Sequence, residues 1–275
     1  ELQGRGRVFT SEGDTEVLLQ GYAEWGPSLL DRLNGMFAFA IHDAKTQTLF
    51  LARDRLGVKP LHYVELADGA LAFASELKGL MAHPLLRRVP DVRAVEDFLA
   101  FGYVPDDVCL LSGVKKLPGG HFLLVERGKS VPRPRRWWDV SFADRASGSA
   151  ATLQEELLSR LRDGVTSRMV ADVPLGAFLS GGVDSSAVVA LMAEASRQAV
   201  RTCTIGFEEA GHDERSYAAQ VAARFATDHR ERVVRSDDFA LIDTLVHAFD
   251  EPFADASALA TYQVCALARE SVTVS

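Results

Sequence analysis

The chain has 275 residues, of which 47% are hydrophobic, and a formal net charge of −8. This length allows one large domain or two ordinary ones, with enough apolar residues for packed cores. The negative charge argues against nucleic acid or an anionic membrane as a main partner, and no apolar run is long enough to span a bilayer. The three cysteines are widely separated, as is typical of reduced thiols in a cytoplasmic protein.

The first part of the chain predicts a layered domain of strands and helices, which we place at residues 1–130. A helix should start near Asp14, and the apolar run from Gly35 to Ile41 predicts a strand buried on both faces. The dipeptide Asp68-Gly69 between two apolar segments is a strong hairpin signal. Further strands and short helices are expected at 48–52, 61–66, 70–74, 76–81, 95–101 and 120–126.

Residues 131–151 differ in composition, with Pro132, Pro134 and the small polar run Ser147-Gly148-Ser149, and they predict a linker between domains. A second domain should occupy residues 152–275 and open with Thr152 and Glu155 as a capping box. Strands expected at 174–179, 201–206, 229–234 and from 272 alternate with helices expected at 185–197, 213–226, 238–248 and 257–270. This alternation predicts a parallel sheet, which binds ligands beyond the carboxyl ends of its strands.

The stretch from Ser180 to Ser186, Ser-Gly-Gly-Val-Asp-Ser-Ser, stands between a buried strand and a helix start. Two glycines and the first turn of a helix turn successive N–H groups toward one place, which suits a phosphate or pyrophosphate. Asp184 would repel a bare phosphate, so we expect it to act through a bridging Mg²⁺. The alternative is an ordinary turn in which Asp184 or Ser185 caps the helix.

The string from Asp172 to Ser186 resembles the pyrophosphate loop of the ATP pyrophosphatases, and most closely that of glutamine-hydrolysing asparagine synthetases. In the first half the stretches 13–17, 33–39, 53–60 and 74–78 resemble the family's glutaminase domain. The segment Lys116 to His121 resembles its exit signature, although Gly119 stands where proline is usual. The resemblance covers nearly the whole chain.

The resemblance implies an α/β fold: a truncated N-terminal-nucleophile αββα glutaminase domain followed by a truncated Rossmann-like parallel-sheet ATP-pyrophosphatase domain. It implies ATP-dependent amidation of aspartate to asparagine through a β-aspartyl-AMP intermediate, with ammonia from glutamine, and a possible homodimer. The family's nucleophilic cysteine would precede Glu1 and its closing loop would follow Ser275, so we expect no catalytic residue and no activity in the chain alone.

The resemblance also implies site residues. Asp14 would hold the α-ammonium group of glutamine; the alternative is that it only caps the helix from Thr15, and the two roles are compatible. Residues expected to bind ATP or pyrophosphate are Leu179, Ser180, Gly181, Gly182, Asp184, Ser185 and Ile205, joined by Ser275 at another strand end. Asp250, Glu251, Pro252, Asp255 and Ser257 resemble a loop near the amino-acid substrate.

Two other functions remain open from the sequence. One is another ATP-pyrophosphatase ligase on the same scaffold, similar to β-lactam synthetase. The other is a nucleotide-binding module without turnover, which the intact loop from Ser180 to Ser185 argues against.

Overall fold

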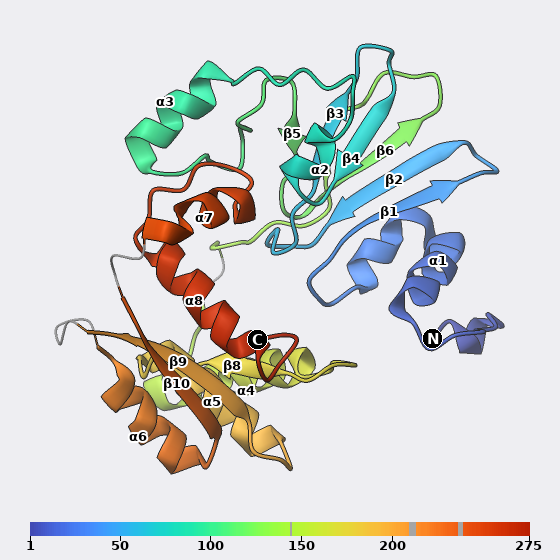
Figure 1. The fold of residues 1–275 in the computed structure, drawn as a ribbon. Coiled ribbons are helices and arrows are strands. Elements are labelled where there is room, and N and C mark those ends of the chain that lie inside the picture. The colour runs from blue at the N-terminus through green and yellow to red at the C-terminus, as the bar shows by residue number, and fades with distance from the viewer. Residues whose placement is uncertain (144, 209–212, 236–238) are drawn as a thin grey trace. The chain divides into compact units, whose positions relative to one another are not determined.

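The computed structural model describes residues 1–143, 145–208, 213–235 and 239–275. The chain divides into two compact units (Figure 1). Unit 1 consists of Glu1–Ser141 together with Asp250–Phe253, and unit 2 consists of Phe142–Phe249 together with Ala254–Ser275. The chain therefore leaves unit 2 and re-enters unit 1 for one short segment.

Unit 1 contains two antiparallel sheets, ordered β1-β2-β6-β7 and β4-β3-β5. Their strands are β1 (Ala38–Asp43), β2 (Thr48–Arg53), β3 (His62–Glu65), β4 (Leu71–Ala74), β5 (Lys115–Lys116), β6 (His121–Glu126) and β7 (Arg135–Arg136). The helices of this unit are α1 (Asp14–Trp25), α2 (Leu77–Met81) and α3 (Val92–Phe101), with 3-10 turns at Gln3–Arg5 and Gly26–Arg32.

Strand β1 lies at the edge of its sheet, where it pairs only with β2 within the described residues. Ile41 is buried but Ala40 is exposed, so the expectation of a strand buried on both faces is wrong. An edge strand has a neighbour on one side only and is covered less completely. The central strand β2 takes that place in the core, where Phe50, Leu51 and Ala52 are fully buried.

The expected hairpin is confirmed. Strands β3 and β4 pair antiparallel, and the amide of Leu66 donates to the carbonyl of Ala70 over 2.8 Å. Gly69 adopts a positive φ of 81°, which explains why glycine suits this turn. The amide of Ala70 also donates to the Asp68 carboxylate, so both residues of the sequence signal shape the turn.

Unit 2 is built on a parallel sheet of order β10-β9-β8. Its strands are β8 (Gly176–Phe178), β9 (Arg201–Phe207) and β10 (Asp228–Val234), and Val274 forms a further parallel bridge with Leu175. The helices are α4 (Ala150–Arg168), α5 (Val183–Ala195), α6 (Arg215–Phe225), α7 (Ile242–Ala248) and α8 (Ser257–Arg269), and a 3-10 turn occupies Phe239–Leu241. The α/β class with a parallel-sheet second domain is thereby confirmed. Asp238, the expected first residue of the helix at 238–248, lies outside the described residues.

The start of α4 corrects one expectation. Ser149 is the N-cap, and its hydroxyl accepts the amide of Thr152 over 3.2 Å. Thr152 lies inside the first turn, so the capping box predicted at Thr152 and Glu155 is wrong. The pattern was shifted because Ser149 and Thr152 are both good caps, and Ser149 begins the helix one turn earlier.

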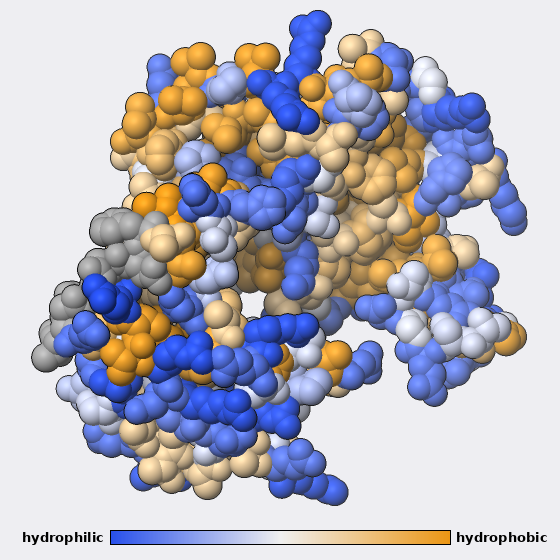
Figure 2. Space-filling model, in the orientation of Figure 1, coloured by the Kyte–Doolittle hydropathy of each residue, from blue (hydrophilic) through white to orange (hydrophobic). Residues whose placement is uncertain are grey.

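Helix α3 presents apolar side chains to solvent, and Figure 2 shows hydrophobic surface over this helix. Leu99 and Phe101 are exposed, whereas Ala94 is fully buried against the rest of unit 1.

No helix in the part of the chain that the structure describes is both long enough and apolar enough to cross a bilayer.

Candidate nucleotide and substrate site

The glycine loop joins β8 to α5. Gly181 has a φ of 80°, in the left-handed region that glycine adopts without strain. A Cβ at this position would lie 2.5 Å from Cβ of Tyr217 and 2.6 Å from the amide nitrogen of Ala218. Gly182 is the N-cap of α5. The two glycines therefore let the chain turn sharply beside α6 and enter a helix whose first amides have no partner inside the helix.

The register of the sheet brings two expected site residues together. Phe178 pairs with Cys203, and the amide of Leu179 donates to the carbonyl of Cys203 over 2.9 Å. Continuing this register places Ser180 beside Ile205. Leu179, Ser180 and Ile205 line one cavity of about 250 Å³ at the carboxyl ends of β8 and β9. This is below the range of about 300–1,000 Å³ usual for ligand pockets, so it suits one part of a nucleotide.

Two serine hydroxyls hold the loop in shape. The Oγ atoms of Ser180 and Ser185 lie 3.0 Å apart, and the amide of Gly182 donates to Oγ of Ser180 over 3.2 Å. The hydroxyl of Ser185 also donates to the carbonyl of Gly182. The hydroxyls of Ser180 and Ser185 thus hold the loop in its conformation, and Gly182 is the N-cap that precedes α5.

Asp184 lies in the first turn of α5 and is exposed to solvent. Within the described residues, no cluster of three or more His, Cys, Asp or Glu could hold a metal ion by itself. Mg²⁺ is usually held by one or two carboxylates together with substrate phosphates and waters. A single exposed carboxylate beside the glycine loop fits that mode of binding.

Several residues that line the cavity were not predicted from the sequence. Helix α8 contributes Ala260, Thr261 and Val264, and the other lining residues not anticipated are Phe178, Cys203, Thr204, Phe207 and Glu214. The α8 side chains recur at helical spacing and lie on one face of the helix. Their periodicity predicted a helix but gave no indication of which sheet end that helix covers.

Ser186 adds a polar group that the described residues leave without a hydrogen-bond partner, since its Oγ atom is buried and unpaired. It follows Ser185 in the first turns of α5. A buried unpaired hydroxyl in a native structure calls for an explanation such as an absent ligand or water.

Ser275 lies elsewhere along the sheet. Val274 bridges Leu175, and the amide of Gly176 donates to the carbonyl of Val274. This register sets Ser275 beside the start of β8, whereas Ser180 follows the end of that strand. Ser275 is therefore not among the residues that line the cavity.

Near the end of β9, an ion pair closes over Gly206. The Arg215 guanidinium donates to both oxygens of Asp213, at 2.8 and 2.7 Å. A Cβ on Gly206 would lie 2.3 Å from Nε of Arg215. The hydrogen bond from Arg215 holds the pKa of Asp213 below its usual value. A larger residue at Gly206 would displace this pair from its position beside the cavity residue Glu214.

Asp14 occupies the first position of α1, and Gly13 is the N-cap, so Asp14 does not cap the helix. Its residue is exposed. Glu16 instead ties down the preceding chain: its carboxylate accepts the amides of Thr10 and Ser11 at 2.9 and 2.7 Å. The Ser11 hydroxyl and these amides lower the pKa of Glu16 to about 2. The capping alternative for Asp14 is thus removed, and its carboxylate faces solvent.

The expected substrate loop is divided between the two units. Asp250 and Glu251 bond to residues of unit 1, whereas Asp255 and Ser257 belong to unit 2. The amide of Ser257 donates to the Asp255 carboxylate over 2.8 Å, which orders the start of α8.

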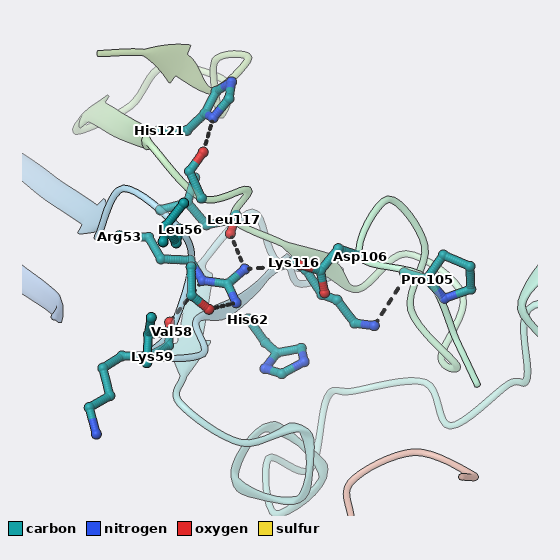
Figure 3. A network of polar contacts seen from close by, with 12 residues as sticks. Arg53, Leu56, Val58, Lys59, His62, Pro105, Asp106, Lys116, Leu117 and His121 are labelled. Carbon is teal, nitrogen blue, oxygen red and sulfur yellow. Dashed lines mark hydrogen bonds and ion pairs between the residues drawn. The ribbon is translucent and has the colours of Figure 1, made fainter. Parts of the chain in front are cut away.

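A buried polar network supports the segment that carries the unit 1 motifs (Figure 3). Arg53 donates to the carbonyls of Gly57, Lys59 and Leu117 at 2.6, 2.8 and 2.7 Å. The Asp54 carboxylate accepts amides from the same loop, among them those of Val58 and Lys59. The charged side chains of Arg53 and Asp54 therefore stabilise the loop that follows β2, because they form hydrogen bonds with its backbone.

Gly119, the departure from the usual proline, packs against this loop. A Cβ there would lie 2.8 Å from the amide nitrogen of Gly57 and 2.9 Å from the carbonyl carbon of Leu56. The close approach of two backbone segments explains a glycine at this position.

Comparison with known proteins gives matches to both parts of the chain. Residues 1–138 match the family described as glutamine amidotransferase domain, and residues 156–275 match the family described as asparagine synthase.

Several curated relatives are similar over nearly the whole chain. A putative asparagine synthetase [glutamine-hydrolyzing] 2 of Methanocaldococcus jannaschii is 38% identical, over 100% of this chain and 54% of that protein. A putative asparagine synthetase [glutamine-hydrolyzing] of Mycobacterium tuberculosis H37Rv is 37% identical, over 98% of this chain and 42% of that protein. Asparagine synthetase [glutamine-hydrolyzing] 1 of Bacillus subtilis is 33% identical, over 100% of this chain and 43% of that protein. The chain spans about half the length of these relatives, or somewhat less.

Proposed function

This chain belongs to the glutamine amidotransferase family through residues 1–138 and matches the asparagine synthase family over residues 156–275, and from that premise we propose that the complete gene product makes asparagine from aspartate with ATP and glutamine. The observation that carries the proposal is the cavity at the ends of β8 and β9, which lies beside a glycine loop and a helix N-terminus. Such a place binds phosphate groups.

In unit 2, the proposed reaction starts with activation of a carboxylate. An oxygen of the aspartate β-carboxylate attacks the α-phosphorus of ATP and forms an acyl adenylate, and the bond to pyrophosphate breaks. The first amides of α5, which have no partner inside the helix, stabilise the charge that collects on the departing pyrophosphate. Leu179, Ser180 and Ile205 hold the adenosine part. Ammonia then attacks the acyl carbon, loses a proton, and displaces AMP.

Mg²⁺ is part of the proposal, and Asp184 would hold it together with the phosphates of ATP. The ion would supply positive charge against the phosphate oxygens. Ser185 supports the loop through its hydroxyl contacts with Ser180 and Gly182.

In unit 1, we propose that Asp14 binds the α-ammonium group of glutamine. Its exposed carboxylate at the start of α1 supports this role. A cytoplasmic location and a homodimer complete the proposal, and sedimentation of the complete gene product tests the dimer.

The deciding experiment is ATP–pyrophosphate exchange by the complete gene product, with aspartate as the acceptor acid. Exchange that depends on aspartate, followed by asparagine formation when glutamine is added, is the expected result. Exchange with another carboxylic acid alone would favour a ligase similar to β-lactam synthetase. No exchange with any acid, despite ATP binding, would favour a module without turnover.

A further inference from the structure

The segment Asp250–Phe253 belongs to unit 1, although the residues on either side of it, Phe249 and Ala254, belong to unit 2. It connects α7 to α8. Its two carboxylates resemble substrate ligands in the sequence, but the structure engages both of them in unit 1.

Glu251 forms a buried ion pair with Lys116. Its Oε2 lies 2.5 Å from Nζ of Lys116, and the two side chains are only 14% and 9% exposed. Its Oε1 accepts the amide of Leu110 over 2.7 Å. Lys116 also donates to the carbonyl of Val104 at 3.2 Å and to that of Pro105 at 3.2 Å, the second of which is drawn in Figure 3. An ammonium group has three donors, so Lys116 is fully paired.

Asp250 supplies a cap that α2 lacks in its own sequence. Within the described residues the side chain of Glu76, the N-cap residue of α2, makes no capping hydrogen bond. The Asp250 carboxylate instead accepts the amides of Leu77 and Lys78, at 2.5 and 3.3 Å. These are the first amides of α2, which have no partner inside the helix. Both acidic residues of the segment therefore use their carboxylates to attach it to unit 1.

The attached segment leads directly into one wall of the nucleotide cavity. Asp255 orders the start of α8 by accepting the amide of Ser257. Along the same helix, Ala260, Thr261 and Val264 line the cavity together with Leu179, Ser180 and Ile205. A helix moves largely as a rigid element, so the placement of its first turn bears on the side chains that follow.

We infer that Glu251 and Lys116 are positioning residues: their ion pair fixes the start of α8 from unit 1 and so links the amidotransferase unit to the shape of the nucleotide cavity. Neither residue is a catalytic residue, since the polar atoms of both are already engaged by protein groups. The chain therefore runs without a break from the attached segment in unit 1 to the helix that lines the cavity.

The first test is hydrogen exchange in the complete gene product, because it does not depend on activity. Glu251→Gln removes the charge and keeps the shape. We expect faster exchange at Leu110 and also along residues 257–264 of α8. The matched control is Glu156→Gln, which removes an exposed ion pair with Arg160 in α4 and should change neither region. Faster exchange at Leu110 with α8 unchanged would overturn the inference.

A conservative variant guards against simple unfolding. Glu251→Asp keeps the charge on a shorter side chain, so its exchange rates in α8 should fall between those of the wild type and Glu251→Gln. Exchange as fast as in Glu251→Gln would show that the charge of the pair is not what holds α8.

The second test is kinetic and rests on the proposed function. Lys116→Met and Glu251→Met each leave one buried partner alone, whereas the double variant removes both. We expect each single variant to raise the KM for ATP about fivefold or more, at the lower end of intersite coupling. The ratio of glutamate to asparagine formed should rise with it. The double variant should lose less than the product of the two single effects.

Independent effects of the two substitutions would contradict the pairing. If the wild-type gene product makes no asparagine at all, the proposed function fails, and the exchange experiment still decides whether the pair positions α8.

Discussion

Gly181 lies directly against Ala218: a Cβ on Gly181 would stand 2.6 Å from the amide nitrogen of Ala218. The glycine loop and α6 are therefore packed backbone to backbone, and Gly181 also has a positive φ. Space and backbone conformation both require glycine here.

Gly181→Ala should destabilise the protein by about 2 kcal/mol or more, because it adds left-handed strain and forces α6 away from the loop. Urea unfolding measures the change. The control is Gly164→Ala in the interior of α4, where the nearest atom to a new Cβ is Nη1 of Arg168 at 3.8 Å. That substitution should stabilise by about 0.5–1 kcal/mol. Equal stability of the two variants would mean that the loop has room after all.

Asp184→Asn should abolish aspartate-dependent AMP formation by the complete gene product and leave glutamine hydrolysis unchanged. The reason is that the amide keeps the shape of the side chain but loses the charge proposed to hold Mg²⁺. AMP and glutamate are measured in the same reaction. AMP release near the wild-type rate would contradict the proposed role of Asp184.

Asp14→Asn should raise the KM for glutamine and leave ammonia-dependent synthesis unchanged. A charge-assisted hydrogen bond is worth about 1.5–3 kcal/mol, so the increase should be about ten- to a hundredfold. Glu12→Gln, also exposed and close in sequence, is the control and should behave like the wild type. An unchanged KM for Asp14→Asn would remove Asp14 from the glutamine site.

Arg53→Lys should cost about 2 kcal/mol or more of unfolding free energy. The guanidinium reaches the carbonyls of Gly57, Lys59 and Leu117 from fixed directions, and an ammonium cannot reproduce that fork. Arg127→Lys, where the native side chain makes an exposed hydrogen bond to Gln47, should cost little. The two variants are compared by urea unfolding, and similar losses would show that the network contributes no more than a surface contact.

Alkylation should distinguish the cysteines. Burial raises the pKa of all three thiols, to about 11 for Cys109 and Cys203, and Cys265 is the one that is exposed. Since the thiolate is the reactive form, iodoacetamide at pH 8 should modify Cys265 first, as mass spectrometry of the folded chain would show. Modification of Cys109 before Cys265 would contradict the assignment.

The raised pKa values of the buried thiols also favour the folded state below pH 9, and this contribution to the free energy of unfolding should disappear as the pH rises through 11.

Local sequence signals predicted much of this structure because their causes are local. The Asp68-Gly69 hairpin and the Ser180–Gly182 turn depend on backbone conformations that a few residues dictate. The burial of β1 could not be predicted in this way, since it depends on which strands lie beside it. The cap of α4 was misplaced because Ser149 and Thr152 compete for the same role.

The candidate site was predictable in part for the same reason. Leu179, Ser180 and Ile205 follow strand ends, and parallel pairing brings such ends together. The α8 wall of the cavity depends on packing between distant elements. Asp250 and Glu251 form hydrogen bonds with residues more than a hundred positions away in the chain. No local sequence pattern predicts these contacts.

The segment Asp250–Phe253 belongs to unit 1, and this affects any attempt to express unit 1 as a separate polypeptide. A polypeptide cut after Ser141 would carry Lys116 without Glu251, and α2 without Asp250. The Lys116 side chain, 9% exposed in the intact chain, would then lack its counter-ion, and breaking a buried ion pair by removing one partner is destabilising. The first unit is therefore not autonomous at its apparent boundary. Lys116→Met would remove the unpaired charge but not restore the cap of α2, whereas a supplied peptide that carries the Asp250–Phe253 sequence would provide both partners.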